Sequence, residues 1–344
     1  MNYKKKLKNV SRPDWTANNF RDPKRLWLDK NENADEVLAK QTKKLLSKIN
    51  KNIIFSYPNL GPLYKKLAQN LKIKPKNILL TAGSDAAIKT VFETFVDDGD
   101  IILRPNPTFA MYGVYSKVFN TKEIVIEYKK SNDGPKLDLK KIINFINKYK
   151  PKLVCLPNSD SPTGQFFDPP DLKKIIQVAK RKKSFVLVDE AYFPFYSKTA
   201  LRLIERYDNL IITRTTAKAW GLAGLRVGYV LSSTENINEM QKVRPMYEIN
   251  NVGAEIVNLY LSHKKLLNQS VKRLLEGKKY FKKELTKMGF TFFKKEEGNF
   301  IHVNFQIHRN KIINELSKNV YFRHNENHNS MKGFSRFSIT SKKN

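Results

Sequence analysis

The chain alternates short runs of Val, Ile and Leu with stretches of helical periodicity, and few folds accommodate this alternation. Seven such runs occur between residues 77 and 233: NILLTAG, DIILRP, EIVIEY, KLVCLP, SFVLVDE, NLIITR and VGYVLSS. Helical patterns such as DAAIKTVFETFV and DLKKIINFINKY separate them. The alternation is typical of an α/β fold, in which helices sandwich a mostly parallel sheet. In such sheets, reactive groups gather at the carboxyl ends of the strands.

The pattern changes near residue 235, which predicts a second domain. We assign residues 51–235 to a large cofactor-binding domain. After about residue 250, the sequence NVGAEIVNLYLSHKKLLNQSVKRLLEGKKYFKKELTKMG predicts a long linking helix, and FTFFKKEEGNFIHVNF and FSRFSITS then predict strands. Residues 1–50 and 236–344 are therefore expected to form a smaller α+β domain.

The charge distribution and the cysteine content limit the classes of protein to consider. The formal net charge is +32, but the lysines are spread as KKL, KKI and KRKK along the polar faces of predicted helices. This spread is typical of solvated faces, and it favours a charged surface over a nucleic-acid site. The single cysteine, Cys155 in KLVCLP, has no second cysteine for a disulfide or a metal site, so we expect a small buried hydrophobe.

The sequence predicts no membrane association. No apolar run approaches the roughly 20 residues that cross a bilayer. The amino terminus, MNYKKKLKNVSRPDW, has basic residues but no apolar stretch for a signal peptide. We therefore expect a cytoplasmic protein.

Chemically active side chains stand at the ends of predicted strands. In SFVLVDEAY, Asp189 lies where an apolar strand stops, a position that suits an ionised group only when a cation faces it. In TAGSD, Ser84 and Asp85 lie at the start of a predicted helix, whose free N–H groups and dipole attract an anion.

The stretch TRTTAKAWGLAGLRVGYV adds a lysine in a loop of small residues. Thr215 precedes Lys218 by three positions, and Arg226 follows the glycines. A phosphate cradle, an amine nucleophile and a carboxylate at three strand ends match pyridoxal phosphate, which offers a phosphate, an aldehyde and a ring nitrogen. Each feature alone is typical of an ordinary loop or helix cap, so the prediction depends on their combination.

Nearly the whole chain resembles the fold type I pyridoxal phosphate aminotransferases, and within them the histidinol-phosphate aminotransferase branch. The matching motifs are LDKNEN, SYPNLG, TAGSDAAI, RPNPTFAMY, SPTGQ, VDEAYFPF, TAKAWGLAGLRVGY, EEGNFIHV and SRFSIT. The resemblance implies a transaminase that exchanges an amino group between an amine and a 2-oxo acid, with 2-oxoglutarate as the acceptor.

The resemblance also implies roles for individual residues. Lys218 would form the Schiff base with the cofactor and then move a proton as general acid and base. Asp189 would keep the ring nitrogen protonated, and Tyr192 would hydrogen-bond the ring hydroxyl. Phe109 would stack on the ring. Further cofactor contacts are implied for Ser84, Asp85, Asn158, Ser161, Thr215 and Arg226.

The substrate contacts and the assembly follow from the same resemblance. Arg336 would bind the anionic group of the substrate, with Arg323 as a second arginine and Asn33 as a further contact. Tyr57 in YPNLG matches a tyrosine that reaches the cofactor phosphate of the neighbouring subunit, which implies a homodimer.

The chain departs from the family pattern at three places. Ser161 stands directly before PTG, where the family has an asparagine, and NEN is followed by ADEV instead of Pro-Tyr. The chain ends soon after SRFSIT, so the usual closing helix is absent or the sequence is cut short.

These departures leave three hypotheses open. The first is a histidinol-phosphate transaminase. The second is the same scaffold acting on another amine, as an aminotransferase for an aromatic or other amino acid or as a decarboxylase of a phosphorylated amino acid. The third is a basic nucleic-acid-binding protein or a pseudoenzyme.

Overall fold

The computed structural model describes residues 7–8, 10–11, 20–325 and 327–342. Most of the amino-terminal sequence on which the expectation of no signal peptide rests lies outside these residues. Within the described ranges, no helix has both the length and the apolar composition needed to cross a membrane.

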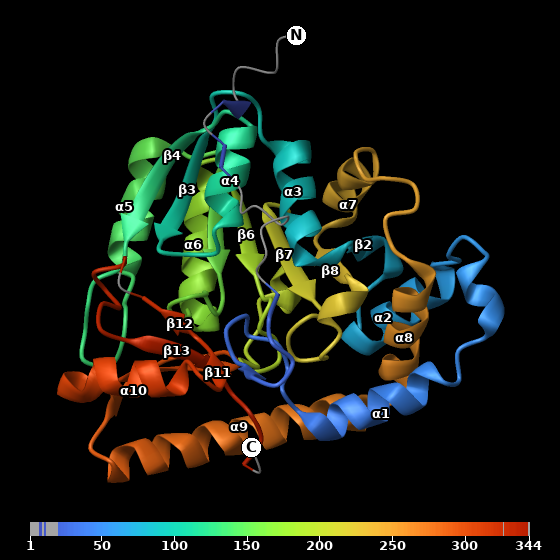
Figure 1. Ribbon diagram of the computed structural model, residues 1–344. Helices are drawn as coiled ribbons and strands as arrows, with labels where there is room; N and C mark the ends of the chain where they lie inside the picture. Colours follow the sequence, from blue (N-terminus) through green and yellow to red (C-terminus); the bar gives the residue numbers. More distant parts are fainter. Residues whose placement is uncertain (1–6, 9, 12–19, 326, 343–344) are drawn as a thin grey trace.

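A seven-stranded sheet forms the centre of the molecule (Figure 1). Its strand order is β2-β8-β7-β6-β5-β3-β4, and only β8 runs antiparallel to its neighbours. The strands are β2 (Ile78–Thr81), β3 (Ile101–Asn106), β4 (Lys122–Glu127), β5 (Leu153–Pro157), β6 (Phe185–Asp189), β7 (Leu210–Thr215) and β8 (Gly228–Leu231). Every one of the seven aliphatic runs is therefore a strand, and the prediction of a mostly parallel sheet is confirmed.

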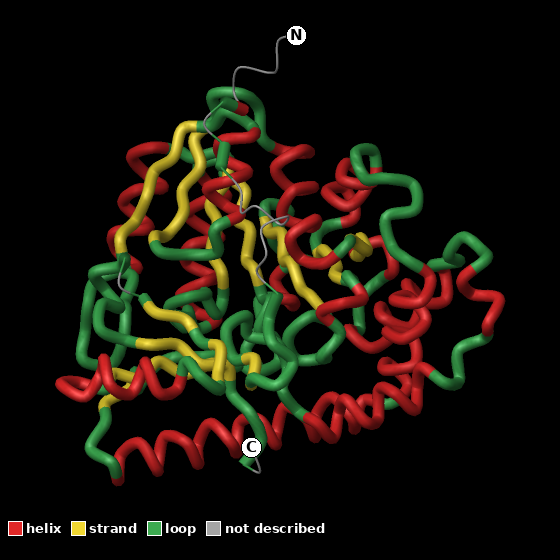
Figure 2. Tube along the Cα trace, viewed as in Figure 1, coloured by secondary structure: helices red, strands yellow, loops and turns green. Residues whose placement is uncertain are grey.

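Helices cover both faces of this sheet (Figure 2). Successive side chains of a strand point to opposite faces, so Val186 and Val188 pack on one side and Leu187 on the other. The first face is covered by α2 (Gly61–Leu71), α5 (Leu139–Tyr149) and α6 (Pro169–Arg181). The second is covered by α3 (Gly83–Phe95), α4 (Met111–Val118) and α7 (Thr234–Gln241). Cys155 is buried and unpaired within the second layer, as its position in an aliphatic run predicts.

A smaller antiparallel sheet lies beside the carboxyl ends of the parallel strands (Figure 1). It has the order β12-β13-β10-β9. Its strands are β9 (Thr291–Phe292), β10 (Phe300–Asn304), β12 (Arg323–His324) and β13 (Ser335–Ser338), and α10 spans Arg309–Leu316. The first strand of the chain, β1 (Leu26–Trp27), pairs in parallel with β11 (Val320–Tyr321). The amino-terminal segment thus packs with the carboxyl-terminal part, while the exact domain boundaries stay a prediction.

The predicted long helix is two helices, α8 (Asn251–Ser262) and α9 (Lys264–Lys287). The prediction of one continuous helix is wrong at His263, whose backbone leaves the helical region with φ −117° and ψ 46°. Helix α1 (Glu36–Leu46) lies along α9, and an ion pair of 2.6 Å joins Arg273 to Asp35 at the start of α1. Short 3₁₀ turns complete the chain: Lys51–Ile54, Pro75–Asn77, Leu201–Leu203, Ala223–Leu225 and Gln306–His308.

Candidate active site

A cavity of about 480 Å³ lies between the carboxyl ends of the parallel strands and the smaller sheet. Segments that are far apart in the sequence line it together. Most of the predicted site residues are among its lining: Ser84, Asp85, Phe109, Ser161, Asp189, Tyr192, Thr215, Lys218, Arg226, Arg323 and Arg336.

One end of the cavity is suited to an anion. Helix α3 begins at Gly83, and among the described residues no side chain caps its first N–H groups. A Cβ on Gly83 would lie 2.6 Å from Nη2 of Arg226, and a Cβ on Gly228 would lie 2.7 Å from the backbone nitrogen of Ser84. The two glycines therefore let the arginine and the β8 backbone approach the helix start closely. Uncapped N–H groups beside a guanidinium are suited to a phosphate.

A buried carboxylate forms the floor of the cavity. Asp189 accepts hydrogen bonds from Thr213 Oγ1 at 3.0 Å, from Ala191 N–H at 3.1 Å and from the Tyr112 hydroxyl at 3.3 Å. Burial raises the pKa of Asp189 to about 6, against the opposing effect of the hydrogen bonds from Thr213 and Tyr112. Within the described part of the chain, no cation pairs with this carboxylate, so a protonated ring nitrogen in the cavity fits it.

Lys218 lies in the same cavity, and its Nζ donates a hydrogen bond to the Lys30 carbonyl at 2.7 Å. Burial, followed by the nearby positive charge of Arg336, lowers the pKa of Lys218 to about 8. A lysine with a lowered pKa offers a larger fraction of neutral amine, which is the form that attacks an aldehyde.

The opposite wall carries two arginines. Arg336 is 9% exposed, and it donates to the Asp29 carbonyl at 2.9 Å and to Ser161 Oγ at 3.2 Å. Its Nε has no partner among the described residues. The register of β12 and β13 places Arg323 directly opposite Arg336, and Nη2 of Arg323 lies 3.9 Å from Asp29 Oδ2. Both guanidinium groups therefore belong to one end of the cavity.

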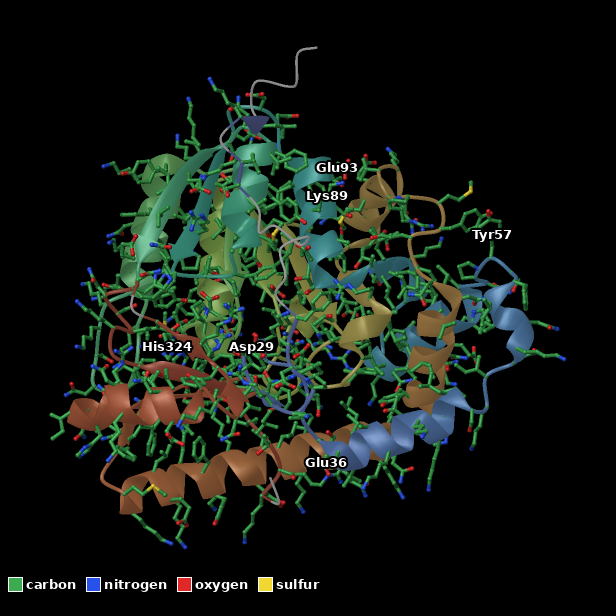
Figure 3. The ribbon with its side chains drawn as sticks, viewed as in Figure 1. Asp29, Glu36, Tyr57, Lys89, Glu93 and His324 are labelled. Carbon is green, nitrogen blue, oxygen red and sulfur yellow. The ribbon has the colours of Figure 1, made fainter. Side chains whose placement is uncertain are left out.

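Three predicted site residues are not among the cavity lining. The Asn158 side chain accepts a hydrogen bond from the Phe167 N–H at 2.7 Å and donates one to the Phe167 carbonyl at 3.2 Å. Asn33 donates to the Ala219 carbonyl at 2.9 Å, next to Lys218 in the chain. Tyr57 is 74% exposed and lies at the outer edge of the molecule (Figure 3). Their contacts to cofactor or substrate stay predictions.

The structure adds residues that the sequence analysis did not single out. Asn31 lines the cavity and donates to the Tyr192 hydroxyl at 2.8 Å, and Asp29, whose carbonyl accepts from Arg336, also lines it. Burial raises the pKa of Tyr192. Tyr112, which bonds Asp189, is also new. All three lie in motifs already noted, LDKNEN and RPNPTFAMY, but the motifs alone do not tell which side chains point inward.

This fold and this site together define a fold type I pyridoxal phosphate enzyme, because the anion site, the buried carboxylate and the lysine suit the phosphate, ring nitrogen and aldehyde of that cofactor. The model of the family described as aminotransferase class I and II matches residues 23–344, and the chain belongs to this family. It is a pyridoxal phosphate-dependent aminotransferase.

Curated relatives match over most of their length. The histidinol-phosphate aminotransferase of Caldanaerobacter subterraneus subsp. tengcongensis is 33% identical, over 93% of this chain and 90% of the relative. That of Thermoanaerobacter sp. is 35% identical, over 83% of this chain and 80% of the relative.

A solved structure shares the fold. The histidinol-phosphate aminotransferase from Sinorhizobium meliloti in complex with pyridoxal-5'-phosphate has a TM-score of 0.79 and 18% identity. The match covers 92% of this chain and 86% of that chain. At 18% identity, this structural similarity shows a common fold and nothing more.

Proposed function

We propose that this chain transfers the amino group of histidinol phosphate to 2-oxoglutarate. The observation that carries the proposal is the pair of arginines, Arg336 and Arg323, on adjacent strands at one end of the cavity. A phosphate monoester has up to two negative charges and several acceptor oxygens, so it suits two guanidinium groups better than a carboxylate does. The names of the two curated relatives support the same substrate.

The proposal assigns the chemistry to a few side chains. When bound, pyridoxal phosphate supplies the aldehyde that binds the substrate amine and a ring that accepts the electron pair left on the α-carbon. Lys218 would take the proton from the amine-bearing carbon of the donor and deliver it to the aldehyde carbon of the cofactor, and the reverse transfer would complete the reaction with the 2-oxo acid. Asp189 holds the proton on the ring nitrogen, and Tyr192 donates a hydrogen bond to the ring hydroxyl.

The remaining site residues bind the cofactor and the substrate. Phe109 stacks on the ring, and Arg226 with Thr215 and the start of α3 binds the cofactor phosphate. Ser161, at the position where the family has an asparagine, accepts a hydrogen bond from Arg336 through its hydroxyl. Asn31, which donates to the Tyr192 hydroxyl, is added to the site residues, and the substrate contact of Asn33 stays a prediction.

The proposed assembly is a homodimer in the cytoplasm. Exposed apolar side chains gather around Tyr57, which stacks on Tyr247 at a centroid distance of 4.0 Å. Ile54, Phe55 and Met246 are 75%, 87% and 76% exposed, respectively. An exposed apolar patch of this kind favours a second copy of the chain as its cover.

The experiment that tests the substrate is a comparison of amino donors. Histidinol phosphate, phenylalanine and phosphothreonine are each supplied with 2-oxoglutarate, and glutamate and carbon dioxide are measured. We expect glutamate from histidinol phosphate with the highest kcat/KM. Glutamate from phenylalanine alone would replace the proposal with a general aminotransferase, and carbon dioxide from phosphothreonine would replace it with a decarboxylase.

A further inference from the structure

Asp160 has a fully buried carboxyl group that none of the roles above uses. Its Oδ1 accepts a hydrogen bond from Thr108 Oγ1 at 2.8 Å, and its Oδ2 accepts one from the Tyr128 hydroxyl at 2.5 Å. Asp160 follows β5, Thr108 follows β3 and Tyr128 follows β4, and these strands are adjacent in the order β5-β3-β4. One carboxyl group thus connects the ends of three neighbouring strands.

Two of the three loops that meet at Asp160 contribute to the cavity wall. Thr108 and the next residue, Phe109, line the cavity, as does Ser161, which follows Asp160. Phe109 is 38% exposed, and its ring meets Tyr112 edge-on at 6.3 Å. Because neighbouring side chains cover the Phe109 ring only in part, the position of the ring depends on the backbone that carries it. The hydrogen bond from Thr108 to Asp160 fixes the backbone of this loop.

The surroundings of Asp160 favour its neutral form. Burial raises the pKa of Asp160 to about 8, the hydrogen bonds from Tyr128 and Thr108 oppose this rise, and the Asp189 carboxylate adds to it. Tyr112, on α4, is a further titratable group that interacts with Asp160. Below about pH 8 the carboxyl therefore keeps its proton, and above that pH a second negative charge appears beside Asp189.

We propose that Asp160 is a positioning residue for the transamination: its carboxyl ties the loop of Thr108 to the loop of Ser161, and so holds Phe109 over the cofactor ring. The inference rests on the proposed role of Phe109 and does not depend on which amine is the substrate. It goes beyond the motifs, because Tyr128 lies outside all of them and its contact with Asp160 exists only in the folded chain.

The test compares variants that break the junction with a matched variant elsewhere. Thr108→Val and Tyr128→Phe each remove one hydroxyl donor to Asp160. Tyr196→Phe removes a similar tyrosine–carboxylate hydrogen bond, to Asp168 at 3.0 Å, away from the cavity lining. The affinity of the apoprotein for pyridoxal phosphate and the visible circular dichroism of the bound cofactor are measured without any amine, and the unfolding midpoint is measured in parallel.

We expect Thr108→Val and Tyr128→Phe to weaken cofactor binding about tenfold and to change the dichroism band, since each removes one hydrogen bond to a buried carboxyl. Tyr196→Phe should lower only the unfolding midpoint. Parent-like affinity and dichroism in both junction variants, or equal changes in Tyr196→Phe, would overturn the proposal.

A pH series on Asp160→Asn gives a second, independent readout. The parent dichroism is expected to change as Asp160 loses its proton near pH 8, and the amide variant should lack this change because it cannot ionise. An unaltered transition in Asp160→Asn would assign it to another group and contradict the proposal. Because no substrate is present, these results stand apart from the outcome of the donor comparison.

Discussion

The two walls of the cavity are built in different ways. On one wall, Asp189 and Thr215 end the adjacent strands β6 and β7, and a continuous ladder of parallel pairing holds them. On the other wall, Arg336 bonds the carbonyl of Asp29, which lies 307 positions away in the sequence. The first wall is a product of local motifs in one sheet, and the second exists only where distant segments meet.

The walls also differ in how firmly their charges are held. Asp189 is 5% exposed and accepts three hydrogen bonds, whereas the Arg323 side chain is 57% exposed, donates one long hydrogen bond of 3.4 Å to the Asp29 carbonyl and lies 3.9 Å from the Asp29 carboxylate. A charge that is fixed and desolvated supports a reaction step, while one with a long, exposed contact exchanges its partner readily. Loss of Lys218 or Asp189 on the first wall should therefore impair turnover of every substrate, and loss of Arg323 on the second wall should alter which substrate is used.

The largest effect is expected from Lys218→Ala on the first wall. Loss of the amine removes both the nucleophile and the proton carrier, so turnover of every donor should fall about 10⁴-fold or more. The measurement is kcat for histidinol phosphate and for a phosphate-free amino acid. Lys278→Met, which changes a buried lysine outside the cavity lining, should keep its activity. Substantial turnover in Lys218→Ala would remove the proposed mechanism.

The next largest effect is expected from Asp189→Asn. The neutral amide cannot hold a proton on the cofactor ring nitrogen, so kcat should fall about 10³-fold while the cofactor stays bound. Thr213→Val keeps the carboxylate and removes one of its hydrogen bonds, and should cost about tenfold. Single-turnover rates and cofactor content are measured together. Near-parent rates in Asp189→Asn would show that the carboxylate does not face the ring.

The second wall is tested by separating the two arginines. Arg323→Ala should lower kcat/KM for histidinol phosphate about tenfold to a hundredfold, because a charge-assisted contact is lost, and should leave a phosphate-free amino acid nearly unaffected. Arg336→Ala should impair both donors. Lys311→Ala, on the exposed surface of α10, is the control for removal of a positive charge. Equal losses for both donors in Arg323→Ala would contradict the contrast between the walls.

The smallest effect is expected from the electrostatic interaction between the two walls, in which Arg336 lowers the pKa of Lys218. With a pKa of about 8, Lys218 offers about one neutral amine in ten at pH 7, so the rate of cofactor uptake by the apoprotein should rise with pH and level off above 8. Arg336→Met removes the nearby positive charge that contributes to this lowering. The midpoint should therefore move upward, and uptake at pH 7 should slow a few-fold.

The control for this coupling is Arg206→Met, an exposed arginine outside the cavity lining. It removes the same charge at a distance from which solvent screens the interaction. We expect its uptake midpoint to equal that of the parent. An unchanged midpoint in Arg336→Met would show that burial alone lowers the pKa of Lys218 and that the two walls do not interact.

The sequence predicted the first wall well because its information is local. The run SFVLVDE specifies both a buried strand and the carboxylate at its end, and TAGSD specifies both a helix start and its free N–H groups. Prediction was weaker where a choice depends on backbone conformation. Asn31 and Asn33 belong to one motif, yet only Asn31, with a φ of +54°, lines the cavity.

The sequence alone determined the alternation of strands and helices, the family and the cofactor. Each of these can be recognised from short sequence patterns, without knowledge of how the rest of the chain folds. The tertiary structure decided the pairing of Arg323 with Arg336 and the junction at Asp160. It also lowers the pKa of Lys218, through burial. These features depend on contacts between residues far apart in the sequence, and on the removal of water from charged groups. Both arise only when the whole chain packs.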